Sequence, residues 1–379
     1  MPSPVRPFVR PLIFVILVIS LYSLLRLKRD HLVDFVVPLQ AATRFVAAEP
    51  LYRPSDGHYQ YKYFPTFALI MVPFTWLPPQ VAEVTWFALT VAMAWMFLWL
   101  SLEALPERRS SARLLFWLTL LFNGKFLVKE LAFGQFNLLT ALCLLGAVMA
   151  AQRGRGAAAG AAIAAGVFVK PYALIMVPWL AWTLGWRPLV VFAVLLAVGL
   201  ALPAAVYGWN GNLTLLSEWY RTVSDTTAPN LMGLETMSFG SMWAKWLTPG
   251  PTASQMAMVS SVCIVAVGGL IMLRRKNVPE PNYLEGAYFF LLVPLLSPQG
   301  WDYVLLIALP AYMLIVDRFR DLPWVWRAIA ALGIFLTSFA VFDIMGRSLY
   351  FWVMGHAFVS VGAVLLAACL VRLRWQAAA

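Results

Sequence analysis

Apolar stretches long enough to cross a lipid bilayer follow one another along nearly the whole chain, and this pattern constrains the fold most strongly. Of the 379 residues, 62% are hydrophobic and only 12% are charged, whereas about a quarter of the residues in a soluble domain are charged. Backbone that crosses a bilayer must satisfy its hydrogen bonds internally, and continuous apolar runs favour helices over the alternating strands of a barrel. The sequence therefore predicts an all-α, polytopic transmembrane helical bundle.

The lengths of these stretches predict roughly ten to thirteen membrane segments, since a span needs about twenty apolar residues and a braced, broken helix needs fewer. The first, 8–27, lacks a signal-peptide cleavage pattern and is interpreted as a retained helix. The segment 157–184, interrupted by Lys170 and Pro171, is expected to enter the membrane and return. The other candidates are 64–78, 80–104, 113–127, 136–152, 187–207, 253–273, 283–297, 300–316, 328–344 and 349–371.

Arginine and lysine residues gather in short loops between these stretches and give the chain a net charge of +11. Such loops mark the cytoplasmic side of a membrane protein, so this charge does not indicate nucleic-acid binding. The external side then receives 28–63, 128–135, the break at Lys170, the segment 208–252 and the turn 297–302. For the crossings to alternate correctly, 64–78 must be re-entrant or interfacial. The expected cytoplasmic residues are Arg108, Arg109, Arg113, Arg153, Arg155, Arg274, Arg275, Lys276, Arg318, Arg320, Arg327, Arg372 and Arg374.

Several kinds of site are not indicated by the sequence. The three cysteines lie inside apolar runs, which favours neither disulfides nor zinc. The three histidines lack the spacing of metal ligands, and the chain has no glycine-rich nucleotide loop. We therefore expect no metal ion and no cofactor.

The first expected external loop contains Asp34, Gln40 and Arg44 at spacings that predict a short amphipathic helix. Such a helix would lie in the membrane surface and hold the Asp34 carboxylate at the boundary between lipid and water.

Two further polar patches interrupt apolar runs. For Lys129, Glu130 and Gln135 a functional role is favoured, because ionisable residues within a membrane usually face a bundle interior; Lys125 could equally snorkel from a plain helical hairpin. Lys170 needs an anionic partner, because an uncompensated ammonium would cost about 2.5 to 3.5 kcal/mol there. That partner is either Glu130 or Asp34, or a substrate phosphate.

The last patch holds Asp302 and Tyr303 after a helix break at Pro298 and Gly300. A solvated aspartate beside boundary aromatic residues and a residue of a functional site are both open interpretations.

Five short motifs, in order along the chain, resemble glycosyltransferase family 87 of the multi-spanning GT-C fold, which includes mycobacterial mannosyltransferases. The histidine that often follows the last tryptophan of the family's pattern is replaced here by Asp302 and Tyr303, which puts any role of such a histidine in doubt. The motifs are Asp34-Phe35 followed by Ala47-Ala48-Glu49-Pro50-Leu51-Tyr52, Tyr63-Phe64-Pro65, Gly134-Gln135-Phe136-Asn137, Lys170-Pro171, and Ser297-Pro298 with Trp301.

The resemblance implies a hexosyltransferase that moves a sugar, mannose by analogy, from a polyprenyl-phosphate donor to a lipid or glycan acceptor in glycolipid biosynthesis. It implies Asp34 as catalytic base on the external face of a bacterial cytoplasmic (inner) membrane. The residues expected to bind the donor's phosphate and sugar are Arg44, Lys129, Glu130, Gln135, Asn137, Lys170, Asp302 and Tyr303.

The expected organisation is a single membrane domain, 1–379. A GT-C-like catalytic module, 1–207, would be followed by the external segment 208–252 and C-terminal helices, 253–379. A secondary transporter or lipid flippase is the main alternative, since broken helices and buried lysines occur there too. The absence of an internal repeat and the concentration of polar groups on one side favour the enzyme. A non-catalytic scaffold is a second alternative.

Overall fold

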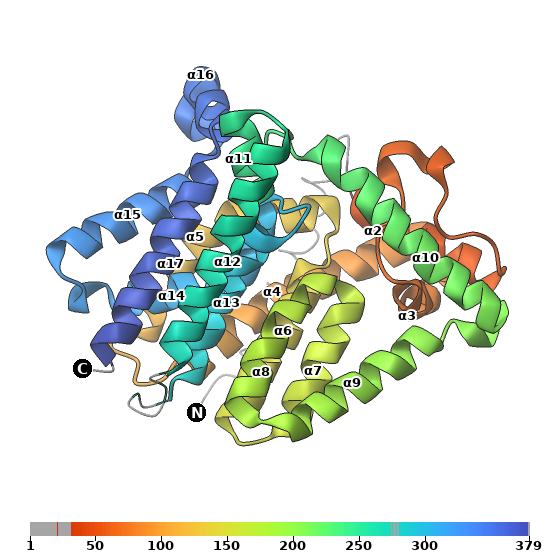
Figure 1. Cartoon of the computed structure of the whole chain (residues 1–379), viewed down its shortest axis with the longest axis horizontal. Helices are drawn as coiled ribbons and strands as arrows, with labels where there is room; N and C mark the ends of the chain where they lie inside the picture. Colours follow the sequence, from red (N-terminus) through yellow and green to blue (C-terminus); the bar gives the residue numbers. More distant parts are fainter. Residues whose placement is uncertain (1–20, 22–31, 274, 276–277, 279, 378–379) are drawn as a thin grey trace, which may run out of the picture.

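The computed structural model describes residues 21, 32–273, 275, 278 and 280–377. Within these residues the regular elements are helices (Figure 1). An isolated antiparallel bridge joins Thr236 to Trp301. The predicted all-α, multi-pass membrane architecture is confirmed. The expected first helix, 8–27, lies outside the described residues except for Leu21.

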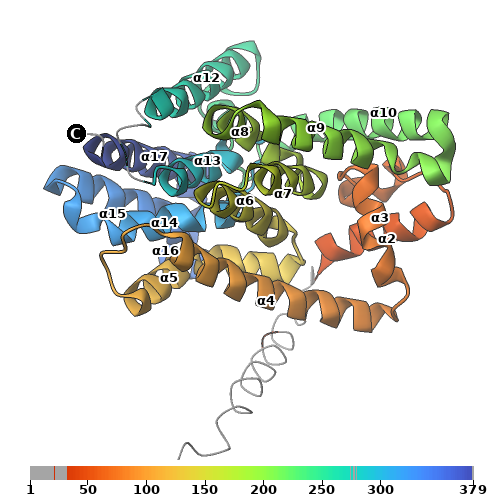
Figure 2. The ribbon, with the colours of Figure 1, turned by 90° about the horizontal axis from the view of Figure 1, so that it is seen from below.

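Helices long and apolar enough to cross a membrane are α4 (Pro79–Ala104), α12 (Pro251–Leu273) and α17 (Phe358–Ala377). Two further spans are possible if each of two pairs, bent by 95° at a short break, counts as one: α9 (Trp186–Ala201) with α10 (Ala204–Asn230), and α15 (Trp324–Ser338) with α16 (Phe342–Gly355). The other predicted crossings are shorter helices or carry charged residues. Seen from below, α12 lies at the edge of the molecule (Figure 2).

The predicted span 349–371 is wrong in its bounds. The helix ends at Gly355 and restarts at Phe358, because Ala357 adopts a left-handed conformation with φ 55°. The crossing helix is therefore α17 alone, while α16 stands at the top of the view (Figure 1).

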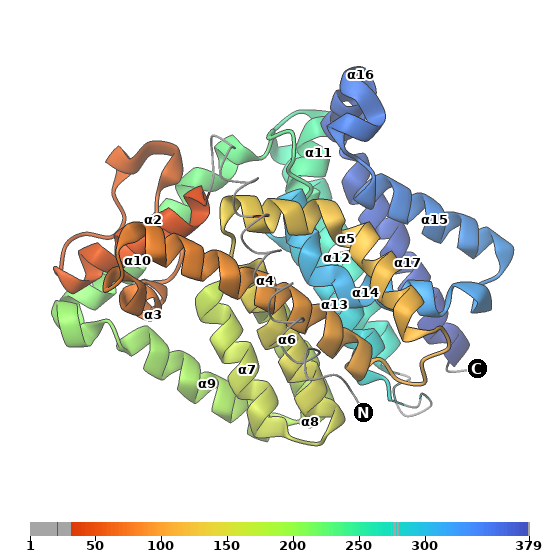
Figure 3. The same cartoon turned by 180° about the vertical axis from the view of Figure 1, so that it is seen from behind.

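The centre of the bundle is built from α5 (Ala112–Phe133), α6 (Asn137–Gln152), α13 (Asn282–Leu296), η4 (Asp302–Ala308) and α14 (Leu309–Asp317). In α13 every residue from Tyr283 to Leu295 is buried except Leu284, so this helix has no lipid-facing stripe and forms the core. Seen from behind, α4 runs diagonally across the bundle (Figure 3). Helix α5 continues through Lys129 and Glu130, which the sequence placed in an external turn.

The chain reverses direction within the segment 157–184, at the break that the sequence predicted. Helix α7 (Gly156–Val169) ends just before Lys170, which is extended, because Pro171 cannot continue the hydrogen-bonding pattern. The turn η2 (Pro171–Ile175) and α8 (Met176–Leu184) follow. The start of α9 then lies beside the start of α7, where Gly156 and Gly160 contact Pro188 closely.

Two short helices lie beside this bundle. Helix α2 (Val33–Val46) buries Phe35, Ala42 and Phe45 on one face, and it packs on α3 (Pro65–Thr75). With 11 residues, α3 is about 17 Å long at 1.5 Å per residue, which is too short for a bilayer core of about 30 Å. Its length agrees with an interfacial or re-entrant segment.

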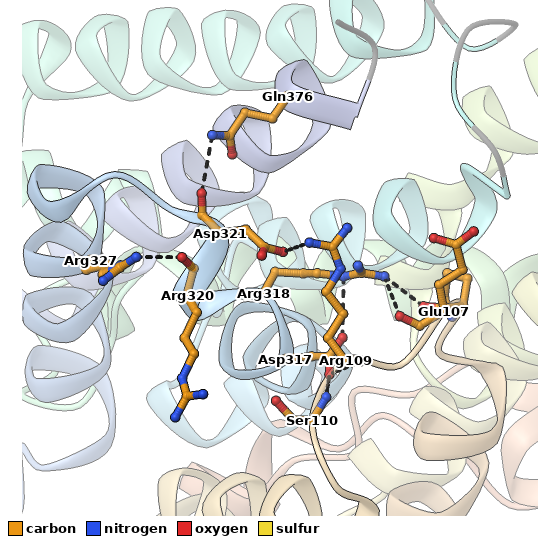
Figure 4. Close-up of polar contacts among 10 residues, drawn as sticks. Glu107, Arg109, Ser110, Asp317, Arg318, Arg320, Asp321, Arg327 and Gln376 are labelled. Atoms are coloured by element: carbon orange, nitrogen blue, oxygen red, sulfur yellow. Dashed lines mark hydrogen bonds and ion pairs between the residues drawn. The ribbon is translucent and has the colours of Figure 1, made fainter.

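Basic loops gather at one end of the central helices. Arg109 pairs with Asp321, while Arg318 donates to the carbonyl oxygens of Pro106 and Glu107 at 2.9 Å (Figure 4). The Asp317 carboxylate accepts hydrogen bonds from the backbone N–H groups of Arg109 and Ser110 (Figure 4). These contacts tie the start of α5 to the end of α14 and to η5 (Phe319–Asp321).

Candidate active site

A cavity of about 950 Å³ lies at the other end of the central helices. All five segments that the sequence assigned to the external side contribute lining residues, and 128–135 contributes Phe133 and Gln135. Gln299 Nε2 donates to Thr226 Oγ1 at 2.9 Å, which ties the turn after α13 to α10 across one wall. The lining comes from all three predicted parts of the chain, so 1–207 does not enclose the cavity alone.

The tight turn after α5 brings Gln135 to Asp34. Gly134 ends α5 in the left-handed conformation, φ 69°, and a Cβ there would lie 2.9 Å from Leu32 Cδ2 and from Phe35 Cβ. Glycine is favoured because it adopts this φ and allows the close approach. The turn is fixed by hydrogen bonds from Leu32 N to Ala132 O (2.8 Å) and from Trp86 Nε1 to Gly134 O (3.1 Å).

A chain of hydrogen bonds then runs from Asp34 to Glu130. Gln135 Nε2 donates to Asp34 Oδ2 and also, at 3.1 Å, to the Tyr303 hydroxyl oxygen. The Lys170 ammonium donates to Gln135 Oε1 at 3.0 Å and to Asn137 Oδ1 at 2.8 Å. The chain ends where Asn137 Nδ2 donates to Glu130 Oε2 at 2.8 Å.

Lys170 lies between the two carboxylates and touches neither. It is 7% exposed, and no carboxylate of the described residues lies within ion-pair distance of its ammonium. The side-chain amides of Gln135 and Asn137 separate it from Asp34 and Glu130. Glu130 is fully buried and accepts from the N–H of Leu138 at 2.9 Å, so it caps the start of α6 rather than lining the cavity.

The Asp34 carboxylate is held in a poorly hydrated position on the cavity wall. Burial raises the pKa of Asp34 above its ordinary value, whereas Lys170 and the hydrogen bond from Gln135 oppose that rise. A carboxylate with a raised pKa is a stronger base than an ordinary aspartate when it is ionised. The arrangement therefore presents a base and a buried cation on one wall.

A second polar group lies behind the lining residues Glu235 and Tyr303. Asp302 is 1% exposed and pairs with Lys129 at 2.8 Å and with Lys125 at 3.2 Å. Lys129 also pairs with Glu235 at 2.8 Å. Asp302 is thus not the solvated boundary aspartate of the alternative interpretation. Lys125, which also donates to Ala340 O at 3.2 Å, does not snorkel to the surface.

The chain matches the family model of glycosyltransferase family 87 over residues 61–298, more than half of its length. The chain belongs to this family. The suspected resemblance is confirmed, and the protein is a membrane glycosyltransferase. A comparison with curated proteins found no match. The match includes the motifs at 134–137 and 170–171, whereas Asp34 and the motif at 47–52 precede it.

In this family 87 glycosyltransferase, some of the predicted site residues line the cavity and others lie away from it. Asp34, Gln135, Lys170 and Tyr303 line the cavity, and Asn137 contacts Lys170 from behind. Arg44 lies elsewhere: its guanidinium forms two hydrogen bonds, of 2.6 and 2.9 Å, with the Asp56 carboxylate. The amphipathic helix was predicted correctly, but its charged residues face different partners.

Sequence reasoning missed Lys62 as a site residue of this family member. Lys62 lines the cavity, and no carboxylate of the described residues pairs with its ammonium. Burial lowers the pKa of Lys62, and Asp34 opposes that change. In the sequence, the feature that could have identified Lys62 was its position just before the Tyr63-Phe64-Pro65 motif. His58 lines the same part of the cavity.

Proposed function

We propose that this glycosyltransferase transfers a sugar, mannose in the favoured case, from a polyprenyl-phosphate donor to a hydroxyl group of a lipid or glycan acceptor. The observation that carries the proposal is that Asp34 lines the same cavity as Lys170 and Lys62, two cations that have no ion-pair partner among the described residues. We place this cavity at the external face of a bacterial cytoplasmic membrane, on the side away from the basic loops.

In the proposed reaction Asp34 removes the proton from the acceptor hydroxyl as its oxygen attacks C1 of the donor sugar. The new C1–O bond forms while the bond from C1 to the phosphate oxygen breaks, and the phosphate leaves with the electron pair. Attack from the face opposite the leaving group inverts the configuration at C1. General base catalysis of this kind contributes about 10²- to 10⁴-fold to a rate.

The departing phosphate needs cations that are not already neutralised. Lys129 is paired with Asp302 and Glu235, and Arg44 is paired with Asp56. Lys170 and Lys62 lack such partners among the described residues, so we assign the phosphate to these two in place of Arg44 and Lys129. A charge-assisted hydrogen bond from either lysine would strengthen as negative charge develops on the leaving oxygen.

A lipid donor also suits the apolar part of the lining. Leu174, Ile175, Val293 and Leu296 line the cavity beside its polar wall. These side chains would contact the first prenyl units, while the phosphate and the sugar occupy the polar end. A cavity of about 950 Å³ lies within the size range of small-molecule sites, about 300 to 1,000 Å³.

The direct test is transfer of radiolabelled mannose from polyprenyl-phosphate mannose to octyl mannoside by the purified protein, with a chelator present. We expect transfer that survives the chelator. We expect Asp34→Asn to lose about 10²-fold or more in kcat while binding the donor as tightly as the unchanged protein. Full turnover by Asp34→Asn would rule out this base, and transfer from a nucleotide sugar alone would rule out the proposed donor.

A further inference from the structure

Glu235 is a second carboxylate on the cavity wall. Among the described residues that line the cavity, the carboxylates are Asp34 and Glu235. The Glu235 side chain is 30% exposed, and the proposed transfer step makes no use of it. Glu235 lies in the segment between α10 and α11 (Phe239–Leu247).

Three contacts hold Glu235 in one position from behind. Lys129 Nζ lies 2.8 Å from Glu235 Oε1, and the Tyr350 hydroxyl donates to the same oxygen at 3.2 Å. The Glu235 carbonyl oxygen accepts from Asp302 N at 2.9 Å. Both side-chain contacts use Oε1, so in the part of the chain that the structure describes Oε2 has no hydrogen-bond donor.

Trp301 lies next to Glu235 through backbone pairing. Trp301 forms the isolated bridge with Thr236, and Met237 N donates to Gly300 O at 2.7 Å. Gly300 lies close to the end of α13, where a Cβ would lie 1.9 Å from Pro294 O, so a side chain would not fit at this turn. The Trp301 ring stacks on the Tyr303 ring at 6.3 Å with an interplanar angle of 4°, and both residues line the cavity.

A sugar ring offers a rim of hydroxyl groups and an apolar C–H face. An ionised carboxylate accepts hydrogen bonds only, so a fixed carboxylate with one free oxygen suits a hydroxyl donor. The indole ring of an adjacent tryptophan offers a flat apolar surface on which the C–H face of the sugar can pack. Sites for small molecules combine such apolar walls with a few fixed polar groups.

We propose that Glu235 and Trp301 form a sugar-binding subsite, in which Glu235 Oε2 accepts a hydroxyl hydrogen bond and Trp301 packs against the C–H face. This inference rests on the proposed function in placing a sugar in the cavity. The subsite makes and breaks no covalent bond. Its occupant is either the donor's sugar or the acceptor's sugar.

Glu235→Gln preserves the shape of the side chain and leaves Lys129 paired with Asp302. Binding is measured in detergent for polyprenyl-phosphate mannose, polyprenyl phosphate and octyl mannoside. We expect Glu235→Gln to weaken binding of one of the two sugar-bearing probes by about tenfold, which equals about 1.4 kcal/mol. Binding of polyprenyl phosphate should not change.

Weaker binding of polyprenyl-phosphate mannose assigns the subsite to the donor, and weaker binding of octyl mannoside assigns it to the acceptor. Asp225→Asn is the matched control, because Asp225 is exposed on α10 and does not line the cavity. Trp301→Leu should weaken the same probe as Glu235→Gln.

Unchanged affinities for both sugar-bearing probes, or equal losses for all three probes with a lower unfolding temperature, would overturn the subsite. Failure of the unchanged protein to bind either sugar-bearing probe would overturn it as well. Binding of octyl mannoside alone, sensitive to Glu235→Gln, would instead preserve the subsite and reject the polyprenyl-phosphate donor.

Discussion

At the scale of single residues, the Asp34 carboxylate is governed by two opposing influences. Burial raises its pKa, and the Lys170 ammonium, one amide away, lowers it. The sequence pointed to Asp34, Gln135 and Lys170 because polar groups are conspicuous in apolar runs. It could not show that amides would separate the charges, since hydropathy does not report which way a side chain faces.

The pH dependence of turnover should report the state of Asp34. A base acts when ionised, so kcat/KM should fall as the pH is lowered through the raised pKa of Asp34. Lys170→Gln removes the cation that lowers this pKa, so the acid limb of the profile should move to higher pH. Arg221→Gln, at an exposed position on α10, should leave the limb in place. An acid limb that Lys170→Gln does not move would contradict this assignment.

Lys62 should contribute to donor binding through its unpaired charge. Hydrogen bonds to charged groups contribute about 1.5 to 3 kcal/mol, so Lys62→Met should raise the donor KM by about tenfold or more. Lys62→Arg should retain most of the affinity, and Arg221→Met is the control. Steady-state kinetics with each substrate varied in turn checks this. A rise confined to the acceptor KM would place the phosphate elsewhere.

At the scale of elements, the turn at Gly134 positions the site. It connects α5 to α6, packs against the start of α2 and presents Gln135 to Asp34. The Gly-Gln-x-Asn motif marked this position in the sequence. The reason for the glycine, its close approach to Leu32 and Phe35, depends on tertiary packing and could not be read from the sequence.

Gly134→Ala should therefore disturb both stability and activity. A non-glycine residue held at positive φ costs about 1 to 3 kcal/mol, and the new Cβ would contact Leu32 and Phe35 at 2.9 Å. We expect a lower unfolding temperature and reduced transfer. Gly146→Ala is the matched control, because a Cβ there meets no atom within 4 Å. Equal stability of the two variants would show that the turn is not constrained.

At the scale of the whole molecule, the helices α5, α6, α7 and α13 and the segment formed by η4 and α14 run between the same two ends of the bundle, in alternating directions. Each has one end near the cavity and the other near a basic loop or, for α13, near Arg275, which pairs with Glu285. Charge in the loops predicted this division. The sequence indicated that the segments forming α3 and α6 are short, but it could not predict the break between α16 and α17, because composition alone does not fix where neighbouring helices brace a broken one.

Labelling of single cysteines tests which end faces outward. In a background without the three native cysteines, Asp225→Cys on α10 should react with a membrane-impermeant maleimide in intact cells. Arg320→Cys, at the basic end, should react only after the membrane is permeabilised. Reaction in the reverse order would place the cavity in the cytosol.

The most direct test of the mechanism is a structure of the Asp34→Asn protein with polyprenyl-phosphate mannose bound. We predict the phosphate beside Lys170 and Lys62, with C1 of the mannose facing the side chain at position 34. A phosphate bound beside Lys129 or Arg44, or a donor sugar held away from position 34, would contradict the account.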